Sequence, residues 1–297
     1  MVMAYSPPPA VAALAVESGT AKAHLGPGRA LVGGFLAGAY IAFGGLLAIV
    51  ASAGLDPKLW GGITTVVTGG VFSLGLILVI VGGAELLTGN MALIPMAVLE
   101  RRVTIARMLV NWFWVTIGNL AGSLFVAYVL ADQTGVIKKG APGTAGLGWT
   151  RLDSIAAGKA VTETHLEQFL RAMGCNWLVC LAVWLALAAM TVSGKILAIV
   201  FPITAFVALG FDHVVANMFF LPLAMWEHAG GVTFSNMLLN LVFAYLGNAV
   251  GAAVFVAGAY WYLYLKDAPV GVTPTDDASA DGAVRQPPTV ARPSTKQ

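Results

Sequence analysis

Three ionisable side chains lie deep inside long apolar stretches of the sequence: Glu85, Asp212 and His213. An acid at the centre of a membrane-spanning helix costs about 2.5–3.5 kcal/mol on insertion scales, so such residues are rare and mark a site or a structural need. Histidine is the side chain that gains or loses a proton near neutral pH. These residues therefore predict a site inside a membrane that handles protons or small ions.

The two acids occupy matching positions in an internal repeat. The segment GAELLTGNM at 83–91 aligns with GFDHVVANM at 210–218, at an offset of 127 residues, with glycine, acid, asparagine and methionine in common. Further on, the pattern Asn-x6-Gly-Asn-x2-Gly begins at Asn111 and again at Asn240, at an offset of 129 residues. Two blocks of matches at nearly one offset indicate that the chain consists of two related halves.

The composition is that of a membrane protein. Of the 297 residues, 58% are hydrophobic and 10% are charged, against about 25% charged in a soluble domain, so too few charges remain to cover a water-facing surface. A spanning helix needs about 20 apolar residues. The sequence has six such stretches, of which the repeated segments interrupt the second and the fifth: 30–52, 63–98, 108–131, 168–191, 196–226 and 236–264.

Each half therefore holds three spans, and an odd number of spans gives the halves opposite orientations in the membrane. This is the inverted-repeat plan of many transport proteins, whose sites lie near the midplane where helices are broken. The sequence predicts an all-α membrane protein with six transmembrane helices, arranged as two inverted three-helix repeats with two broken helices. The first and fourth spans show no convincing alignment with each other.

Two roles are open for the matching acids, Glu85 and Asp212. In the first, each carboxylate accepts hydrogen bonds from backbone N–H groups that the break sets free. In the second, each carboxylate forms an ion or proton site directly. We favour the first role, because symmetry between the halves indicates architecture. The repeated asparagines Asn90 and Asn217 join them as predicted supports of the broken helices.

His213 breaks the symmetry between the halves, because its repeat partner is Leu86. Thr88 likewise has a partner of another type, Val215. A lone membrane histidine is often only a hydrogen-bonded core residue, but this one lies in an interruption and next to an acid. We therefore predict a functional role for His213. Asn176, in the fourth span, has no visible repeat partner and is a further candidate.

Other chemistries find no support in the sequence. There is no phosphate-binding glycine loop, so ATP does not drive the protein directly. There is no pair of intramembrane histidines for haem and no metal-ligand cluster. Cys175 and Cys180 stand on different sides of a helix, as packed thiols rather than a disulfide or metal pair. The net charge of +2 is too small to indicate nucleic acid. We expect no cofactor and no metal.

Two other classes of protein are alternatives. A neutral-solute channel for water or glycerol carries paired Asn-Pro-Ala boxes at its half-helix ends, and this sequence has only Gly-Asn and Ala-Asn pairs there. An intramembrane enzyme needs a nucleophile–base pair or a redox centre, and only His213 with Thr88 is a candidate. We therefore expect no enzymatic activity.

The sequence resembles the formate/nitrite transporter family in five segments: GGVFSLGLILVIVGGAELLTGN, NWFWVTIGNLAG, GCNWLVCLAVW, FVALGFDHVVANMF and GNAVGAAV. Members of this family are homopentamers with an aquaporin-like protomer. The resemblance implies a channel or transporter for small monovalent anions of weak acids, formate and nitrite first, coupled to protons. Hydrosulfide, acetate and lactate belong to the same class, and the motifs do not choose among them.

The resemblance also implies roles for single residues. His213 looks like the family's central pore histidine, with Thr88 as its partner and Asn176 as a neighbouring pore residue. Lys159 resembles the lysine of the external vestibule, although it stands one residue further from Asn176 than usual. Leu87 and Asp212 depart from the phenylalanine and glutamate that are frequent at these positions. Two constrictions are implied. Phe72 and Phe206 would form the external one, and the cytoplasmic one would be formed by Leu76, Leu86, Leu87 and Val179.

The orientation follows from Lys and Arg in the short loops. Arg101, Arg102 and Arg107 follow the second span and Lys195 follows the fourth, whereas only Lys58 lies between the first and second spans. Both termini are therefore predicted to be cytoplasmic, in a multi-pass protein of the cell membrane. The chain divides into an N-terminal tail (1–28), a transmembrane channel domain (29–265) and a C-terminal tail (266–297) that we expect to be disordered.

Overall fold

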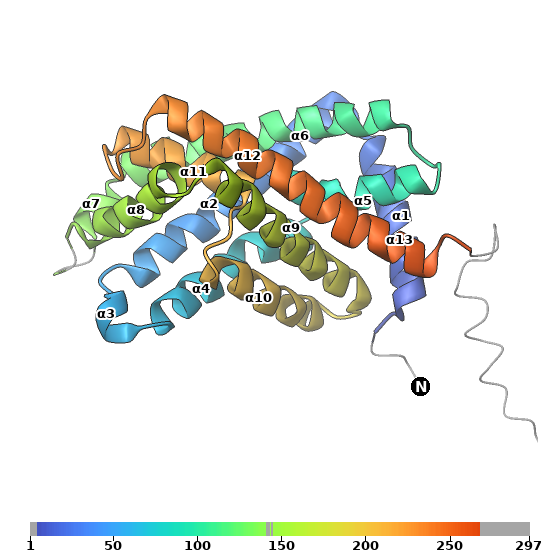
Figure 1. The fold of residues 1–297 in the computed structure, drawn as a ribbon, viewed down its shortest axis with the longest axis horizontal. Helices are drawn as coiled ribbons and strands as arrows, with labels where there is room; N and C mark the ends of the chain where they lie inside the picture. The colour runs from blue at the N-terminus through green and yellow to red at the C-terminus, as the bar shows by residue number, and fades with distance from the viewer. Residues whose placement is uncertain (1–4, 141–142, 144, 268–297) are drawn as a thin grey trace, which may run out of the picture.

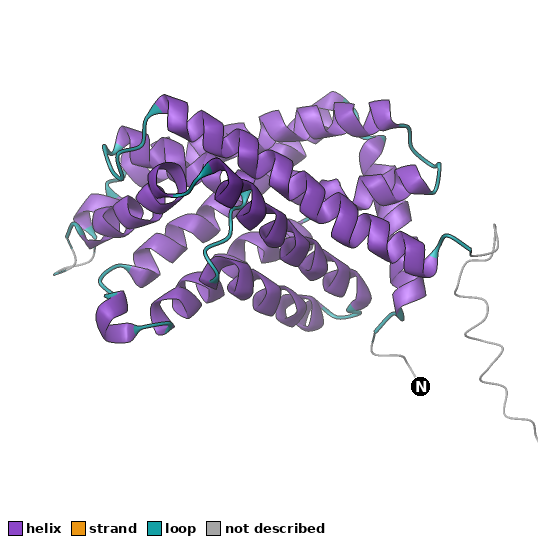
Figure 2. Cartoon of the chain, viewed as in Figure 1, coloured by secondary structure: helices purple, strands orange, loops and turns teal. Residues whose placement is uncertain are grey.

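The structure of the protein is a computed structural model and describes residues 5–140, 143 and 145–267. Within these residues the regular structure is helical (Figures 1 and 2), apart from an isolated bridge between Tyr5 and Ala189. The predicted disordered tail lies outside the described residues, except for Lys266 and Asp267.

The helices form two sets that match in order. The first set comprises α2 (Pro27–Ser52), α4 (Ile63–Gly82), α5 (Leu87–Leu99), α6 (Ile105–Phe125) and the π-helical η1 (Val126–Asp132). The second comprises α9 (His165–Ala188), α10 (Val192–Ala208), α11 (Val214–Trp226), α12 (Phe234–Ala252), the π-helical η3 (Ala253–Gly258) and α13 (Ala259–Tyr264). In each set a broken span lies between two continuous ones, which confirms the predicted fold class.

Shorter helices precede each set. α1 (Pro8–Ala23) comes before the first set, and α8 (Leu147–Ala157) with the π-helical η2 (Gly158–Thr162) comes before the second. α3 (Pro57–Trp60) and α7 (Val136–Lys139) lie at the same end of the molecule as α8, opposite the end where α1 lies (Figure 1). These two ends are named the α8 end and the α1 end below.

α1 occupies most of the segment that the sequence analysis assigned to an N-terminal tail. Pro8 and Pro9 stand in its first turn, where proline fits because the first N–H groups have no intrahelical acceptor. The helix packs so closely on α5 that a Cβ at Gly19 would overlap the carbonyl group of Leu93. These residues are therefore part of the helical bundle.

A left-handed glycine follows the first part of each broken span. Gly83 has φ 78° directly after α4, and Gly210 has φ 71° shortly after α10. Glycine adopts this conformation at no steric cost, so it is the common residue at a helix end. The second parts, α5 and α11, are apolar helices of 13 residues that run from the interior toward opposite ends of the molecule (Figure 1). Their N-terminal ends therefore meet in the interior.

Close backbone contacts hold the continuous helices together. α2 packs on α6 where a Cβ at Gly38 would overlap the carbonyl group of Asn119. α9 packs on α12 in the same way, since a Cβ at Gly251 would overlap the carbonyl group of Met173. Small residues allow such approach in a membrane, where packing and interhelical hydrogen bonds drive helix association.

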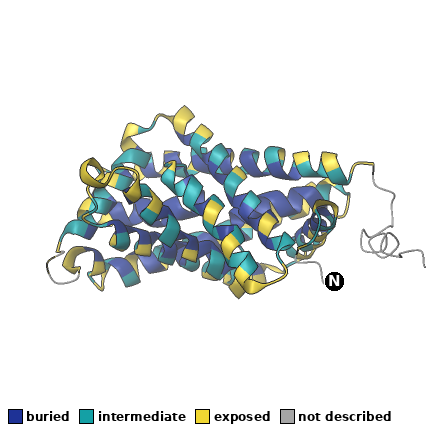
Figure 3. Ribbon diagram, turned by 90° about the horizontal axis from the view of Figure 1, so that it is seen from below, coloured by how far each residue is buried: buried dark blue, intermediate teal, exposed yellow. Residues whose placement is uncertain are grey.

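The outward faces of the bundle are apolar. Within the described part of the chain, five helices have the length and hydropathy of a membrane span, and the broken spans add three shorter apolar helices. Large apolar side chains such as Phe113, Leu197 and Phe201 are more than half exposed, and exposed positions recur along the outward faces (Figure 3). Such surfaces require lipid as the surrounding solvent. The chain is a multi-pass membrane protein.

Candidate transport pathway

The half-helices α5 and α11 meet at a hydrogen bond between Thr88 and His213. Nε2 of His213 lies 2.9 Å from the Thr88 hydroxyl oxygen, and both side chains are buried. His213 is also the N-cap of α11, where its Nδ1 accepts the Ala216 N–H at 3.1 Å. Because Nδ1 is an acceptor, the neutral ring carries its proton on Nε2 and donates it to Thr88. The two residues that break the sequence repeat are thus in direct contact.

A second group of bonds holds the backbone of Thr88. Its carbonyl oxygen accepts hydrogen bonds from the Asn176 amide at 3.1 Å and from the Cys180 thiol at 3.4 Å. The same amide also donates to the carbonyl of Asn248 at 2.8 Å. Asn176 therefore joins α5 to α12, and its amide is directed at backbone rather than at the histidine ring. Cys180 was predicted only as a packed thiol, although its place four residues after Asn176 puts both on one helix face.

The N-terminal ends of α5 and α11 both point into this centre. A helix N-terminus carries the equivalent of about half a positive charge, together with N–H groups that lack intrahelical acceptors. An asparagine side chain accepts the first N–H of each half-helix, on Leu87 and on Val214. The remaining partial charge at the two ends favours an anion or another electron-rich ligand at the centre.

Two aromatic rings stand on the α8 side of this centre. Phe72 of α4 and Phe206 of α10 meet edge to face, with ring centroids 5.8 Å apart and planes at 89°. The Phe206 ring also stacks against the imidazole of His213 at 5.9 Å. Both phenylalanines are 3% exposed. Apolar surface therefore narrows the approach to His213 from the α8 end.

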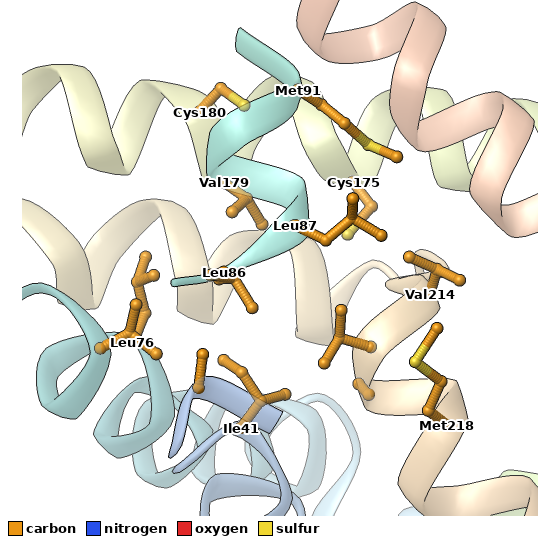
Figure 4. Packing of buried hydrophobic residues seen from close by; sticks show 14 of the residues in the cluster. Ile41, Leu76, Leu86, Leu87, Met91, Cys175, Val179, Cys180, Val214 and Met218 are labelled. Atoms are coloured by element: carbon orange, nitrogen blue, oxygen red, sulfur yellow. The ribbon is translucent and has the colours of Figure 1, made fainter. Parts of the chain in front are cut away.

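The four residues predicted for the other constriction divide into two pairs. Leu76 and Leu86 line a cavity of about 30 Å³ on the α1 side. Leu87 and Val179 are buried but are not among the lining residues of that cavity. In Figure 4 the side chain of Leu87 points away from that of Leu86. The structure thus brings Leu76 and Leu86, rather than all four residues, to the α1-side cavity.

A larger cavity of about 230 Å³ opens at the α8 end and reaches Phe72, Phe206 and His213. We name it the α8-side vestibule. The predicted vestibule residue Lys159 lines it, but its charge is already paired. Its Nζ lies 2.9 Å from a carboxylate oxygen of Asp212, whose side chain is fully buried. The structure also places three charged residues in this vestibule that the sequence analysis did not single out, namely Arg151, Glu163 and Arg171.

Glu85 belongs to a closed network of four residues. One carboxylate oxygen pairs with the Lys22 ammonium at 2.8 Å, and the other accepts the Asn90 amide at 3.1 Å. Asn90 also donates to the side-chain oxygen of Asn111 at 3.0 Å, and Asn111 donates to the carbonyl of Lys22 at 2.8 Å. The network ties α1, the break, α5 and α6 together.

Asp212 belongs to a second network, which is the equivalent of this one in the second half. Its Oδ1 pairs with Lys159 at 2.9 Å and accepts the Asn217 amide at 2.8 Å. Asn217 donates to the side-chain oxygen of Asn240 at 2.8 Å, and Asn240 donates to the carbonyl of Lys159 at 3.0 Å. The partners follow in the same order, so Lys22 is the repeat counterpart of Lys159.

The first N–H group of each half-helix bonds to a further asparagine, and not to the carboxylate as we expected. Asn119 accepts the Leu87 N–H at 2.9 Å and donates to the carbonyls of Gly34 at 2.8 Å and Glu85 at 2.9 Å. The corresponding partners of Asn248 are the Val214 N–H and the carbonyls of Ala172 and Asp212. Amide side chains can both donate and accept, which a carboxylate cannot, and this explains the difference.

These carbonyl contacts align the first spans of the two halves. Gly34 and Ala172 accept equivalent hydrogen bonds and so occupy equivalent positions. The same offset makes Gly38 the counterpart of Asn176. The first and fourth spans follow the repeat although their sequences do not align, because backbone carbonyls make the shared contacts and any residue type supplies a carbonyl.

Two inverted sets of three spans, with two half-helices whose N-terminal ends meet at a buried polar pair, define a membrane channel or transporter. The sequence profile of the formate/nitrite transporter family matches residues 9–262. The chain belongs to this family, whose members are channels and transporters rather than enzymes.

Individual relatives agree with this assignment. The chain is 48% identical over 251 residues to a probable formate transporter of Methanothermobacter thermautotrophicus, which covers 81% of this chain and 90% of that protein. A solved FNT family ion channel is similar with a TM-score of 0.77 and 30% identity over 85% of this chain and 98% of its own. A pentameric formate channel with formate bound is similar with a TM-score of 0.70 and 30% identity over 81% and 98% of the two chains.

Proposed function

We propose that this protein is a channel for small monovalent anions of weak acids, formate first and nitrite second, and that each anion passes together with a proton supplied through His213. The hydrogen bond between His213 Nε2 and the Thr88 hydroxyl, at the point where two half-helix N-termini meet, carries the proposal. Family membership supports the class of solute, as does the similar solved channel that has formate bound.

The apolar side chains around this centre make a bare anion costly to move. Phe72 and Phe206 on one side and Leu76 and Leu86 on the other offer no hydrogen-bond donors, and an isolated charge is strongly destabilised among such groups. Protonation of the anion removes this cost. With an Asp-like pKa of about 3.9, only about one carboxylic acid in a thousand is protonated at pH 7. A proton source at the centre therefore raises the permeable fraction.

The hydrogen bonds of His213 define how the ring delivers a proton. In the proposed step the Nε2 proton passes to the Thr88 hydroxyl, which passes its own proton to the anion. Nε2 then regains a proton from water in the α8-side vestibule, which His213 lines. Nδ1 keeps its bond to the Ala216 N–H, so the ring is neutral and in the same tautomer before and after the transfer. The positive ends of α5 and α11 hold the anion during this exchange.

Uptake of labelled formate into liposomes that contain the purified protein tests the proposal. Uptake is measured at one external pH below neutrality and at one above it. We expect formate and nitrite to be taken up faster at the lower pH. Glycerol should cause no osmotic swelling beyond that of the lipid alone. If folded protein takes up neither anion, or if glycerol passes freely, the proposed function is wrong.

His213→Asn tests the proton step. Asparagine is a good helix N-cap and keeps a hydrogen-bonding side chain, but it cannot relay a proton. We expect formate uptake at neutral pH to fall by about a hundredfold, as for the loss of a general acid–base group, and its pH dependence to disappear. His165→Asn, at an exposed histidine that stacks on Phe243, is the control and should transport normally. Unchanged pH dependence in His213→Asn would rule out the relay.

We further propose that the protein assembles as a homopentamer with its α1 end in the cytoplasm. The pentameric state of the similar formate channel supports the first part. Arg101, Arg102 and Arg107 lie around the connection between α5 and α6, at the α1 end, and basic loops of this kind stay in the cytoplasm. Native mass spectrometry tests the assembly. Labelling of cysteines introduced by Lys58→Cys and Arg102→Cys, with a reagent that cannot cross membranes, tests the orientation.

A further inference from the structure

The α8-side vestibule contains one basic residue without an acidic partner. Three basic residues line the cavity: Arg151, Lys159 and Arg171. Lys159 forms an ion pair with Asp212 at 2.9 Å, and Arg171 forms one with Glu163 at 3.0 Å. Among the described residues, no carboxylate forms an ion pair with Arg151. Its guanidinium is therefore the basic group of the vestibule that a solute can meet without displacing a carboxylate.

Two hydroxyl groups orient the Arg151 guanidinium. Its Nε donates to Ser52 Oγ at 2.9 Å, and its Nη2 donates to Thr68 Oγ1 at 3.2 Å. Each hydroxyl donates its own proton to a carbonyl one turn earlier in its helix, on Ala48 and on Thr64 respectively, so its lone pairs face the arginine. A guanidinium has five N–H donors, and these two bonds leave donors free for a ligand. The hydroxyls fix the group without neutralising it.

Arg151 lies on the approach to the aromatic narrowing. Its anchor Thr68 stands four residues before Phe72 on α4, which is about one helical turn, or roughly 5.4 Å along the axis. Arg151, Phe72 and Phe206 line the same cavity. Burial lowers the pKa of Arg151 from its usual range, but an arginine stays protonated at neutral pH. A cation that is oriented, charged and unpaired thus faces the route to His213.

We propose that Arg151 is the anion-docking residue of the α8-side vestibule, and that it binds a small oxyanion through two parallel hydrogen bonds before the anion passes Phe72 and Phe206. The inference rests on the proposed function and deepens it, because it assigns the docking role to Arg151 in place of Lys159. A planar guanidinium matches the two oxygens of a carboxylate or of nitrite. Hydrosulfide has a single heavy atom and cannot use both bonds, so the site favours formate and nitrite over hydrosulfide.

Uptake kinetics in liposomes test the docking role. In Arg151→Gln we expect the formate concentration for half-maximal uptake to rise about tenfold, as for the loss of a charge-assisted hydrogen bond, with a maximal rate near that of the wild type. Arg151→Lys keeps the positive charge but cannot donate two parallel hydrogen bonds, so its formate affinity should lie between those of Arg151→Gln and the wild type. Hydrosulfide uptake should change less than formate uptake in both variants. Lys58→Gln removes an exposed charge outside the vestibule and should change nothing.

A purely structural role for Arg151 predicts another result. If the arginine only fastens α8 to α2 and α4, Arg151→Gln lowers thermal stability and maximal rate together and leaves the half-saturating concentration unchanged, which would overturn the proposal. Ser52→Ala removes one anchor of the guanidinium and keeps its charge. It should therefore shift the half-saturating concentration far less than Arg151→Gln does.

A binding measurement separates this inference from the proposed function. Formate that binds the folded, solubilised protein should raise its unfolding temperature with increasing concentration, and Arg151→Gln should abolish the rise. If the wild type shows this Arg151-dependent rise but transports no anion, the docking site stands and the proposed function falls. If the wild type transports formate and neither measurement depends on Arg151, the docking site falls and the function stands.

Discussion

The two halves of the molecule share a scaffold and differ at its centre. In both, an acid beside the break binds a lysine and an asparagine, and a further asparagine accepts the first N–H of the half-helix. At three equivalent positions the residue types diverge: Leu86 against His213, Thr88 against Val215, and Gly38 against Asn176. The first half supplies the hydroxyl of the central pair and the second half supplies the imidazole.

This comparison separates residues that build the pathway from residues that can act in it. A contact present in both halves serves the fold, because each half needs it to hold its own break. A polar residue present in one half alone has no such explanation. If both halves carried leucine at the position of His213, Thr88 would have no imidazole partner. The direct contact between Thr88 and His213 depends on the halves being unlike.

The largest expected effect comes from breaking one of the two matching ion pairs. Asp212 has a fully buried side chain, whereas that of its counterpart Glu85 is 14% exposed. Lys159→Met leaves a buried carboxylate without its cation, which costs about 3–5 kcal/mol of folding free energy. Lys22→Met should cost clearly less, because water can reach Glu85. Thermal unfolding of the solubilised variants measures the difference. Equal losses of stability would show that the two ion pairs stabilise the fold equally despite their different exposure.

A smaller effect is expected at Gly38, the divergent position at which the first half carries no side chain. A Cβ at Gly38 would overlap the backbone carbonyl of Asn119, so Gly38→Ala forces α2 and α6 apart at a cost of about 1–3 kcal/mol. Gly70→Ala is the matched control, because a Cβ at this helical position meets nothing within 4 Å. The control should be neutral or stabilising by up to about 1 kcal/mol. Equal unfolding temperatures for the two variants would contradict the close contact.

The smallest effect concerns pH at the α8 end. Burial and the nearby negative charge of Asp212 raise the pKa of Glu163 to about 8, against the opposing charges of Lys159 and Arg171. Below this pH the group is neutral, and as the pH rises through it Glu163 gains a negative charge that opposes anions in the vestibule. The half-saturating formate concentration should then rise roughly threefold, which corresponds to less than about 1 kcal/mol. Glu163→Gln should remove this alkaline step, and its persistence would assign the step to another group.

The sequence was sufficient for features that side chains encode. The breaks were predictable because Gly83 and Gly210 each precede an acid and an asparagine at matching distances. The alignment of the first and fourth spans was not predictable, because Gly34 and Ala172 contribute only carbonyl oxygens to the shared contacts. Lys22 was missed for a related reason, since its helix begins with prolines that also suit a tail.

Arg151 shows a different limit. The sequence places it in a connecting segment with several basic residues, and nothing in their spacing tells which of them meets an acid. Lys159 was the natural candidate for attracting anions, yet the fold places it against Asp212. Pairing of charges between segments far apart in the chain depends on the tertiary structure, so the sequence alone could not distinguish the neutralised lysine from the unpaired arginine.

The two cavities beside the centre have a consequence for hydration. The α8-side vestibule has a volume of about 230 Å³ and the α1-side cavity about 30 Å³, and a cavity needs about 10–15 Å³ of such volume to hold one water molecule. An anion arriving from the α8 end can wait with several of its water molecules, whereas one arriving from the α1 end sheds them at the moment it enters. Dehydration therefore falls at different steps in the two directions. The two ends of the pathway thus present an anion with unequal room for its water.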